Sequence, residues 1–176
     1  EAEQKAQALS DNRPFFICQS MQCLRLADPV DAVICALDSI NYLQKPADCR
    51  KTFQRVAKAL TPGGIFVFDI NTPCKLRGLD GQVFLDETDD TYCVWRTEFD
   101  EKKRLCYYGM DIFCLQGTSW QRSFEEHIEY AYEPEELEAW LREAGFTDIR
   151  QYGDLVLRRP KQTEQRIFFS ARKENP

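Results

Sequence analysis

Residues 31–68 constrain the fold more than any other part of the chain. Residues 31–37 (DAVICAL) are almost continuously apolar, which is typical of a strand in a sheet covered on both faces. A helical pattern begins at Pro46 and stops at residues 61–64 (TPGG), and residues 65–68 (IFVF) follow as a strand. A strand, a helix and a second strand in this length predict a right-handed crossover, so we expect two neighbouring parallel strands.

The remaining segments predict an alternating α/β chain. Residues 1–9 are rich in helix formers with no capping residue ahead of them, and they read as a helix already under way. Residues 15–18 (FFIC) predict a short buried strand. A helix is expected over residues 134–144, and two last strands are expected at residues 147–151 and 166–171.

The middle of the chain follows a different pattern. Residues 83–132 contain aromatic-rich segments without a helical period, separated by turns at residues 100–103 and 116–119. This pattern predicts an antiparallel β meander. We therefore expect a single domain over residues 1–176 with the meander inserted into it.

Charge and cysteine spacing exclude several classes of function. The formal net charge is -6, so no nucleic-acid partner is expected. No apolar run approaches the roughly 20 residues of a membrane span, so no membrane partner is expected either. The eight cysteines contain no C-x-x-C pair, which argues against a zinc site and favours reduced thiols in the cytoplasm over a disulfide framework.

Polar residues follow both strands of the predicted crossover. Asp38, Ser39 and Asn41 come directly after the first strand, and Asp69 and Asn71 come directly after the second. Ligands of open parallel sheets bind beyond the carboxyl ends of the strands, so these side chains are candidates for a binding site. Each residue alone would also suit a helix cap or a turn, but their matched positions on neighbouring strands favour a site.

These segments resemble the second half of a class I S-adenosylmethionine-dependent methyltransferase. The resemblance rests on DAVICALDSINYL, on the L-T-P-G-G turn before IFVFDIN, and on EELEAWLREAGF followed by the final RIFFSAR strand. FDINTPCKLRG and RSFEEHIEYAY are similar to segments of methyltransferases that act on small molecules. The resemblance implies a Rossmann-like α/β sheet with S-adenosylmethionine as cofactor and a small molecule as methyl acceptor.

The resemblance also implies roles for individual residues. It places the cofactor beside Ser20, Met21, Ala36, Leu37 and Asp38. It places the acceptor beside Asn41, Tyr42, Asp69 and Asn71. Asp38 is also a candidate catalytic residue, and the only histidine, His127, is a candidate base that shares one strand face with Glu125 and Glu129. A histidine between glutamates on a strand is more often simply solvated.

Two departures from the family pattern qualify this interpretation. The acidic glycine-rich cofactor loop is missing, so we expect the sheet to be incomplete at the N-terminus and the chain to be a truncated form of an enzyme. In addition, Ser20 stands where relatives commonly have an aspartate that faces the adenine. In the family, the first strand lies beside residues 33–37, so those residues would form an exposed edge that favours a homodimer.

The sequence bears on two other classes of function. A non-catalytic binding or scaffold module that retains part of the methyltransferase fold stays open as the alternative. A nicotinamide-dependent oxidoreductase would need G-x-G-x-x-G, which the sequence does not contain.

Overall fold

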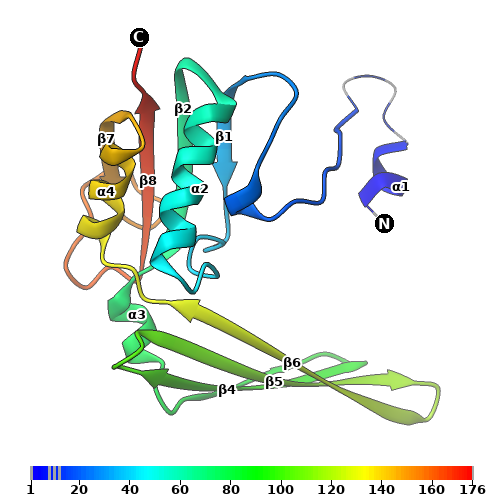
Figure 1. Cartoon of the computed structure of the whole chain (residues 1–176). Coiled ribbons are helices and arrows are strands. Elements are labelled where there is room, and N and C mark those ends of the chain that lie inside the picture. The colour runs from blue at the N-terminus through cyan, green and yellow to red at the C-terminus, as the bar shows by residue number, and fades with distance from the viewer. Residues whose placement is uncertain (1, 8, 10, 12, 176) are drawn as a thin grey trace.

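The computed structural model describes residues 2–7, 9, 11 and 13–175, and these form two sheets (Figure 1). The first sheet has the order β1-β2-β8-β7 and the second has the order β3-β4-β5-β6. Helices α2 and α4 lie against the first sheet, and the second sheet extends away from one end of it. Residues 1 and 8 of the predicted N-terminal helix lie outside the described residues, and α1 spans Ala2–Gln7.

The predicted crossover is confirmed. β1 (Val30–Cys35) and β2 (Leu60–Asn71) pair in parallel, and α2 (Pro46–Ala59) connects them. Residues 61–64, predicted as a turn, form an irregularity inside β2, because Val30 pairs with Leu60 while Ala32 pairs with Ile65. Glycine is required there: Gly63 has φ 74°, and a Cβ on Gly64 would lie 2.9 Å from the Thr61 carbonyl oxygen.

The core lies between this sheet and the two helices that cover it. Apolar residues of α2 and α4 (Pro134–Glu143) recur at helical spacing and bury one stripe, including Phe53 and Leu137. Phe53, Phe66 and Phe68 contact one another, and Phe68 stacks on Phe169 of β8 with ring centroids 4.7 Å apart. This aromatic cluster fixes the position of β2, whose carboxyl end carries the polar residues of the site.

The last two strands belong to the first sheet, as predicted. β7 (Phe146–Tyr152) and β8 (Arg166–Lys173) are antiparallel, and β8 is also antiparallel to β2. The register pairs Asn71 with Arg166. Because β8 runs opposite to β2, its first residue lies at the same edge as the last residue of β2.

The antiparallel meander is also confirmed. It consists of β3 (Val83–Glu87), β4 (Thr91–Asp100), β5 (Leu105–Gln116) and β6 (Ser119–Tyr130). Helix α3 (Pro73–Gly78) connects β2 to this sheet, and Thr72 caps it by accepting a hydrogen bond from the Lys75 backbone amide. The meander therefore leaves the first sheet directly after the polar end of β2.

Two sequence predictions differ from the structure. Residues 15–18 are extended but form no strand among the described residues, and Phe15 is 95% exposed. No described strand lies beside this segment to accept its hydrogen bonds. β1 is an edge strand within the described part of the chain, as expected, but Ile34 on it is 74% exposed, so the prediction that both faces of this strand are covered is wrong there.

Candidate functional site

The carboxyl ends of β1 and β2 open into a cavity of about 500 Å³. Its other wall is the inner face of the antiparallel sheet, so the cavity lies between the two sheets. The lining residues are Asp38, Tyr42, Asn71, Lys75, Leu79, Phe84, Asp86, Trp95, Tyr108, Met110, His127, Glu129 and Arg166. Asp38, Tyr42, Asn71 and His127 were singled out from the sequence, and the structure brings these four together.

An unusual backbone turn positions Asp38. Leu37 and Asp38 both have positive φ, 59° and 49°, which is uncommon for residues other than glycine. The turn directs the Asp38 backbone N–H to the Asp69 carboxylate, which accepts at 3.1 Å. Strain of this kind persists where surrounding contacts hold it and is concentrated at functional sites.

Arg166 joins the ends of three strands. Its guanidinium donates to Asp69 at 2.6 Å, to Asp38 at 3.0 Å and to Asn71 Oδ1 at 3.4 Å. The Asp69 side chain is only 2% exposed, and it does not line the cavity. Asp69 thus holds Arg166 and the Asp38 turn in place, while Asp38 faces the cavity.

Asn41 connects the two sheets. Its side-chain amide donates to the backbone carbonyls of Asn71, at 2.9 Å, and Tyr130, at 3.0 Å, and accepts from the Asn71 N–H at 3.0 Å. Asn41 is fully buried and does not line the cavity. The Asn41 side chain was predicted to face the acceptor. Its hydrogen bonds instead hold the end of β2 and the end of β6 together.

His127 lies on the inner face of β6 with both ring nitrogens near protein groups. Its Nδ1 lies 3.0 Å from the Tyr42 hydroxyl, and its Nε2 lies 3.4 Å from a Glu125 carboxylate oxygen. Burial is the main reason why the pKa of Tyr42 is raised, with Glu129 and Asp38 adding to the effect. Tyr42 is thus a neutral hydroxyl that can orient the imidazole.

Glu129 is a functional candidate that the sequence did not single out. It is 4% exposed, and its Oε2 accepts a hydrogen bond from Asn71 Nδ2 at 2.8 Å. Burial, with the charge of Asp38 added, raises the pKa of Glu129 to about 7. The strand alternation that grouped Glu129 with His127 was a usable signal. Arg166 could also have been predicted, because it begins the last strand, and a last strand antiparallel to β2 starts at the edge where β2 ends.

The predicted cofactor residues border a second, smaller cavity of about 220 Å³. Ser20 and Met21 line it together with apolar residues of β1 and α2, and Met21 Sδ lies 3.7 Å from Cys35 Sγ. Ala36 and Leu37 are exposed just beyond β1. Cys35 lines the smaller cavity and Asp38 lines the larger one, and only Ala36 and Leu37 separate them in the chain.

The described residues fit part of the implied cofactor. The apolar lining of the smaller cavity suits a flat ring system, and Asp38 supplies a carboxylate to the larger cavity. All glycines of the chain lie after residue 62, so no glycine-rich loop precedes β1 in this sequence to surround the rest of the cofactor. Within the described ranges, no group of three or more His, Cys, Asp or Glu side chains is placed to hold a metal ion.

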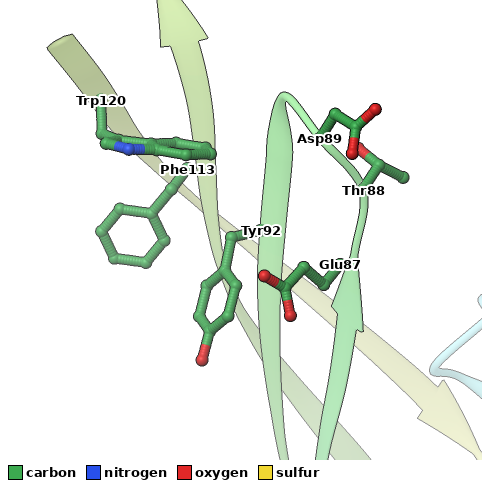
Figure 2. Close-up of a pocket in the computed structure, with 6 residues that line it drawn as sticks. All are labelled: Glu87, Thr88, Asp89, Tyr92, Phe113 and Trp120. Carbon is green, nitrogen blue, oxygen red and sulfur yellow. The ribbon is translucent and has the colours of Figure 1, made fainter. Parts of the chain in front are cut away.

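A third hollow lies at the far end of the antiparallel sheet and is separate from these residues (Figure 2). Tyr92, Phe113 and Trp120, on three strands, line it together with Glu87, Thr88 and Asp89. Its volume, about 860 Å³, is larger than that of either cavity described above, but no residue predicted for the site lines it. The candidate site is therefore the cavity between the two sheets.

All eight cysteines are free, and burial raises the pKa of Cys35 to about 11, so its thiol is a poor nucleophile. No helix in the part of the chain that the structure describes is long and apolar enough to cross a membrane.

Comparison with known proteins identifies relatives along nearly the whole chain. No family model matches the sequence. The putative methyltransferase YqeM of Bacillus subtilis (strain 168) is 29% identical over 170 residues, which are 95% of this chain and 69% of that protein. A putative methyltransferase of Geobacillus sp. (strain WCH70) is 28% identical over 175 residues, 98% of this chain and 70% of that protein.

Solved structures agree with these relatives. The crystal structure of an S-adenosylmethionine-dependent methyltransferase from Clostridium acetobutylicum ATCC 824 matches with a TM-score of 0.87 and 27% identity. The match covers 98% of this chain and 69% of that one. CalS10, an amino pentose methyltransferase from Micromonospora echinaspora, shares the fold with a TM-score of 0.70 and 20% identity, over 88% of this chain and 63% of that one. The chain is therefore homologous to S-adenosylmethionine-dependent methyltransferases and corresponds to the C-terminal portion of their fold, about 69% of their length.

Proposed function

We propose that the chain contributes the acceptor site, and part of the cofactor site, of a methyltransferase that transfers a methyl group from S-adenosylmethionine to a small molecule. The observation that carries this proposal is the cavity between the sheets, where Asp38 and Asn71 follow two neighbouring parallel strands. The homology supports the cofactor. The cavity of about 500 Å³ has the size of a small-molecule site.

The proposal assigns roles to both cavities. Ser20, Met21, Ala36 and Leu37 border the cofactor. Asp38 lies between cofactor and acceptor, and Tyr42 and Asn71 face the acceptor. Asn41 and Asp69 act through the residues that they hold, and His127, oriented by Tyr42, lies on the acceptor wall. Bound S-adenosylmethionine would supply the activated methyl group, and the protein would hold the acceptor in line with it.

Structures that share the fold support a small-molecule acceptor. CalS10 is an amino pentose methyltransferase and KedS8 is a sugar N-methyltransferase, and both share the fold of this chain. We further propose that residues 83–132 are an insert within a single domain over residues 1–176, and that the protein works in the cytoplasm, where free thiols persist.

Calorimetric titration of the purified chain with S-adenosylhomocysteine tests whether the cofactor side works as it stands. We expect saturable binding with one site per chain, weaker than in the longer relatives because the glycine-rich loop contributes nothing. Met21→Lys should abolish the heat, since it places a charge in the apolar cavity, whereas Lys58→Met on the exposed side of α2 should leave it unchanged. No heat from a folded protein would favour the non-catalytic module.

The exposed edge of β1 leads to a second expectation, that two chains associate through it. β1 pairs only with β2 among the described residues, and Ile34 is 74% exposed. Unpaired strands with apolar residues recruit other strands. Light scattering at micromolar concentration should give the mass of a dimer, and Ile34→Lys should give the monomer. A monomeric parent protein would contradict this proposal.

A further inference from the structure

Glu129 is a buried carboxylate that faces the cavity between the sheets and forms no ion pair with a described residue, although the charge of Lys75 reaches it. It is 4% exposed, its Oε2 accepts a hydrogen bond from the neutral amide of Asn71 at 2.8 Å, and its second side-chain partner is the neutral hydroxyl of Tyr108. No ion pair among the described residues includes Glu129 or Asp86, which lines the same cavity. A buried carboxylate without a cation is costly unless a ligand supplies the missing charge.

The two cations of the cavity are already bound to protein groups. Arg166 donates to Asp69 at 2.6 Å and to Asp38 at 3.0 Å, so two carboxylates balance its single charge. Lys75 Nζ donates to Asn71 Oδ1 at 2.8 Å. The cavity lining therefore carries three carboxylates against two cations, and one of these cations is shared with Asp69. An anionic guest would meet this excess of negative charge, whereas a cationic guest would balance it.

The rest of the lining suits the body of such a guest. Phe84, Trp95 and Met110 come from three neighbouring strands of the antiparallel sheet and form an apolar and aromatic wall. Aromatic faces attract cations within about 6 Å of the ring centre. A small molecule with an apolar part and a positive group would use both the wall and the carboxylates.

We propose that this cavity binds the methyl acceptor as a protonated amine, and that Glu129 is the group that binds its ammonium and takes its proton. The methyl-transfer step rests on the function proposed above. A proton passes from R–NH3+ to the Glu129 carboxylate, which leaves R–NH2 with a free electron pair. That pair forms the N–C bond to the methyl group while the C–S bond breaks and its electrons return to sulfur. The products are R–NH2–CH3+, the neutral thioether, and a proton that leaves Glu129 for solvent.

The surroundings of Glu129 suit a proton acceptor near neutral pH. Burial, with the charge of Asp38 added, raises the pKa of Glu129 to about 7. A base is most effective when its pKa lies near the working pH. Several charged or titratable groups face Glu129 or share its cavity. They are Asp38 beyond β1, Tyr42 in the following turn, Lys75 on α3, Asp86 on β3, Cys106 and Tyr108 on β5, His127 on β6 and Arg166 on β8.

Glu129 fits this role better than the other candidate base. The His127 ring contacts the Tyr42 hydroxyl through Nδ1 and approaches Glu125 through Nε2, so both nitrogens face protein groups. The His127 side chain is also 35% exposed. His127 would then shape the wall of the cavity, and Glu129 would exchange the proton.

Three probes of similar shape and different charge test the proposal on the purified chain. These are 2-phenylethylamine, 2-phenylethanol and 3-phenylpropionate, titrated while the indole N–H signal of Trp95 is followed by NMR. Trp95→Phe identifies that signal. We expect the amine to bind at least about tenfold more tightly than the alcohol and the acid to bind most weakly. The affinity for the amine should rise from pH 5 to pH 8, because Glu129 ionises through about 7 and only its charged form attracts the ammonium.

Glu129→Gln is the decisive variant, and Glu126→Gln is its matched control. Glutamine can still accept from Asn71 Nδ2, so the fold should persist, and its NMR spectrum checks this. Glu126 is three residues away on the same strand, exposed on the opposite face. Glu129→Gln should weaken amine binding about tenfold or more and remove most of its rise with pH, whereas Glu126→Gln should bind like the parent.

The outcomes separate this inference from the proposed function. Equal affinity for amine and alcohol, or an unchanged affinity in Glu129→Gln, would overturn the amine site. Amine binding without any binding of S-adenosylhomocysteine would support the amine site and remove the methyl-transfer step. Binding of S-adenosylhomocysteine without selectivity for the amine would leave the proposed function standing and refute the inference.

Discussion

Arg166→Met should lower the free energy of unfolding by about 3–5 kcal/mol, because it leaves a buried carboxylate without its cation. Asp69 is 2% exposed, and Arg166 is its partner at 2.6 Å. Asp38 would lose its partner at the same time. The remaining hydrogen bond from the Asp38 N–H to Asp69 is too weak to balance an uncompensated charge. Urea unfolding, followed by circular dichroism, measures the change.

Two further variants show whether the charge is the cause. Arg172→Met removes an exposed arginine from the same strand, where it donates to the Gly63 carbonyl at 2.6 Å, and it should cost about 1 kcal/mol or less. The double variant Asp69→Asn with Arg166→Met should recover part of the loss, since no buried charge remains. If the double variant is as unstable as Arg166→Met alone, lost packing rather than charge explains the effect.

Asp38→Asn should reduce kcat/KM of the intact enzyme by about 100-fold or more, because Asp38 lines the proposed acceptor cavity and comes three positions after Cys35, which lines the proposed cofactor cavity. Small misplacements of reacting groups have effects of this size. Asparagine is the sharpest choice, since it tolerates the left-handed backbone of this position, whereas Asp38→Ala would add strain to the loss of the carboxylate. Asp38→Ala should abolish turnover.

The measurement compares methyl transfer by the intact protein and by each variant, with S-adenosylhomocysteine affinity recorded in parallel. Asp31→Asn is the control, because Asp31 is an exposed aspartate at the opposite end of the same strand. A variant that folds, binds the cofactor product and keeps the parent kcat/KM would refute the assignment of Asp38. A lost affinity with unchanged kcat would place Asp38 on the cofactor side alone.

Local patterns were sufficient to predict the parallel pair, helices α2 and α4 and the antiparallel meander, whereas the short helix α3 was not predicted. Periodicity in residues 31–68 and alternation in residues 83–132 each depend on neighbours that are near in sequence, and the observed elements follow them closely. Residues 15–18 were mispredicted because an apolar run becomes a strand only if another strand accepts its hydrogen bonds. Whether a partner exists is a property of the whole sheet and cannot be read from four residues.

The site was predicted in part, for the same reason. Asp38 and Asn71 were found because both end strands of one local crossover. Arg166 lies 128 residues from Asp38 in the chain, and only the antiparallel return of β8 brings them together. Glu129 could be recognised as a site residue only once the position of the second sheet relative to the first was known. Asn41 was found as a polar residue at the right edge, but its hydrogen bonds to backbone groups became visible only in three dimensions.

The long hairpin of β5 and β6 separates the cavity wall from its own turn, so insertions at the turn should leave the wall unchanged. Leu105 to Gln116 pair with Tyr130 to Ser119 without a register shift, and Gly117 supplies the positive φ of the turn. Because alternation sets which face each side chain takes, adding residues in matched pairs at the turn would lengthen the hairpin without rotating His127 or Glu129. The turn is thus a natural attachment point for a fluorophore or an affinity handle, through which the enzyme could be followed or immobilised with its cavity undisturbed.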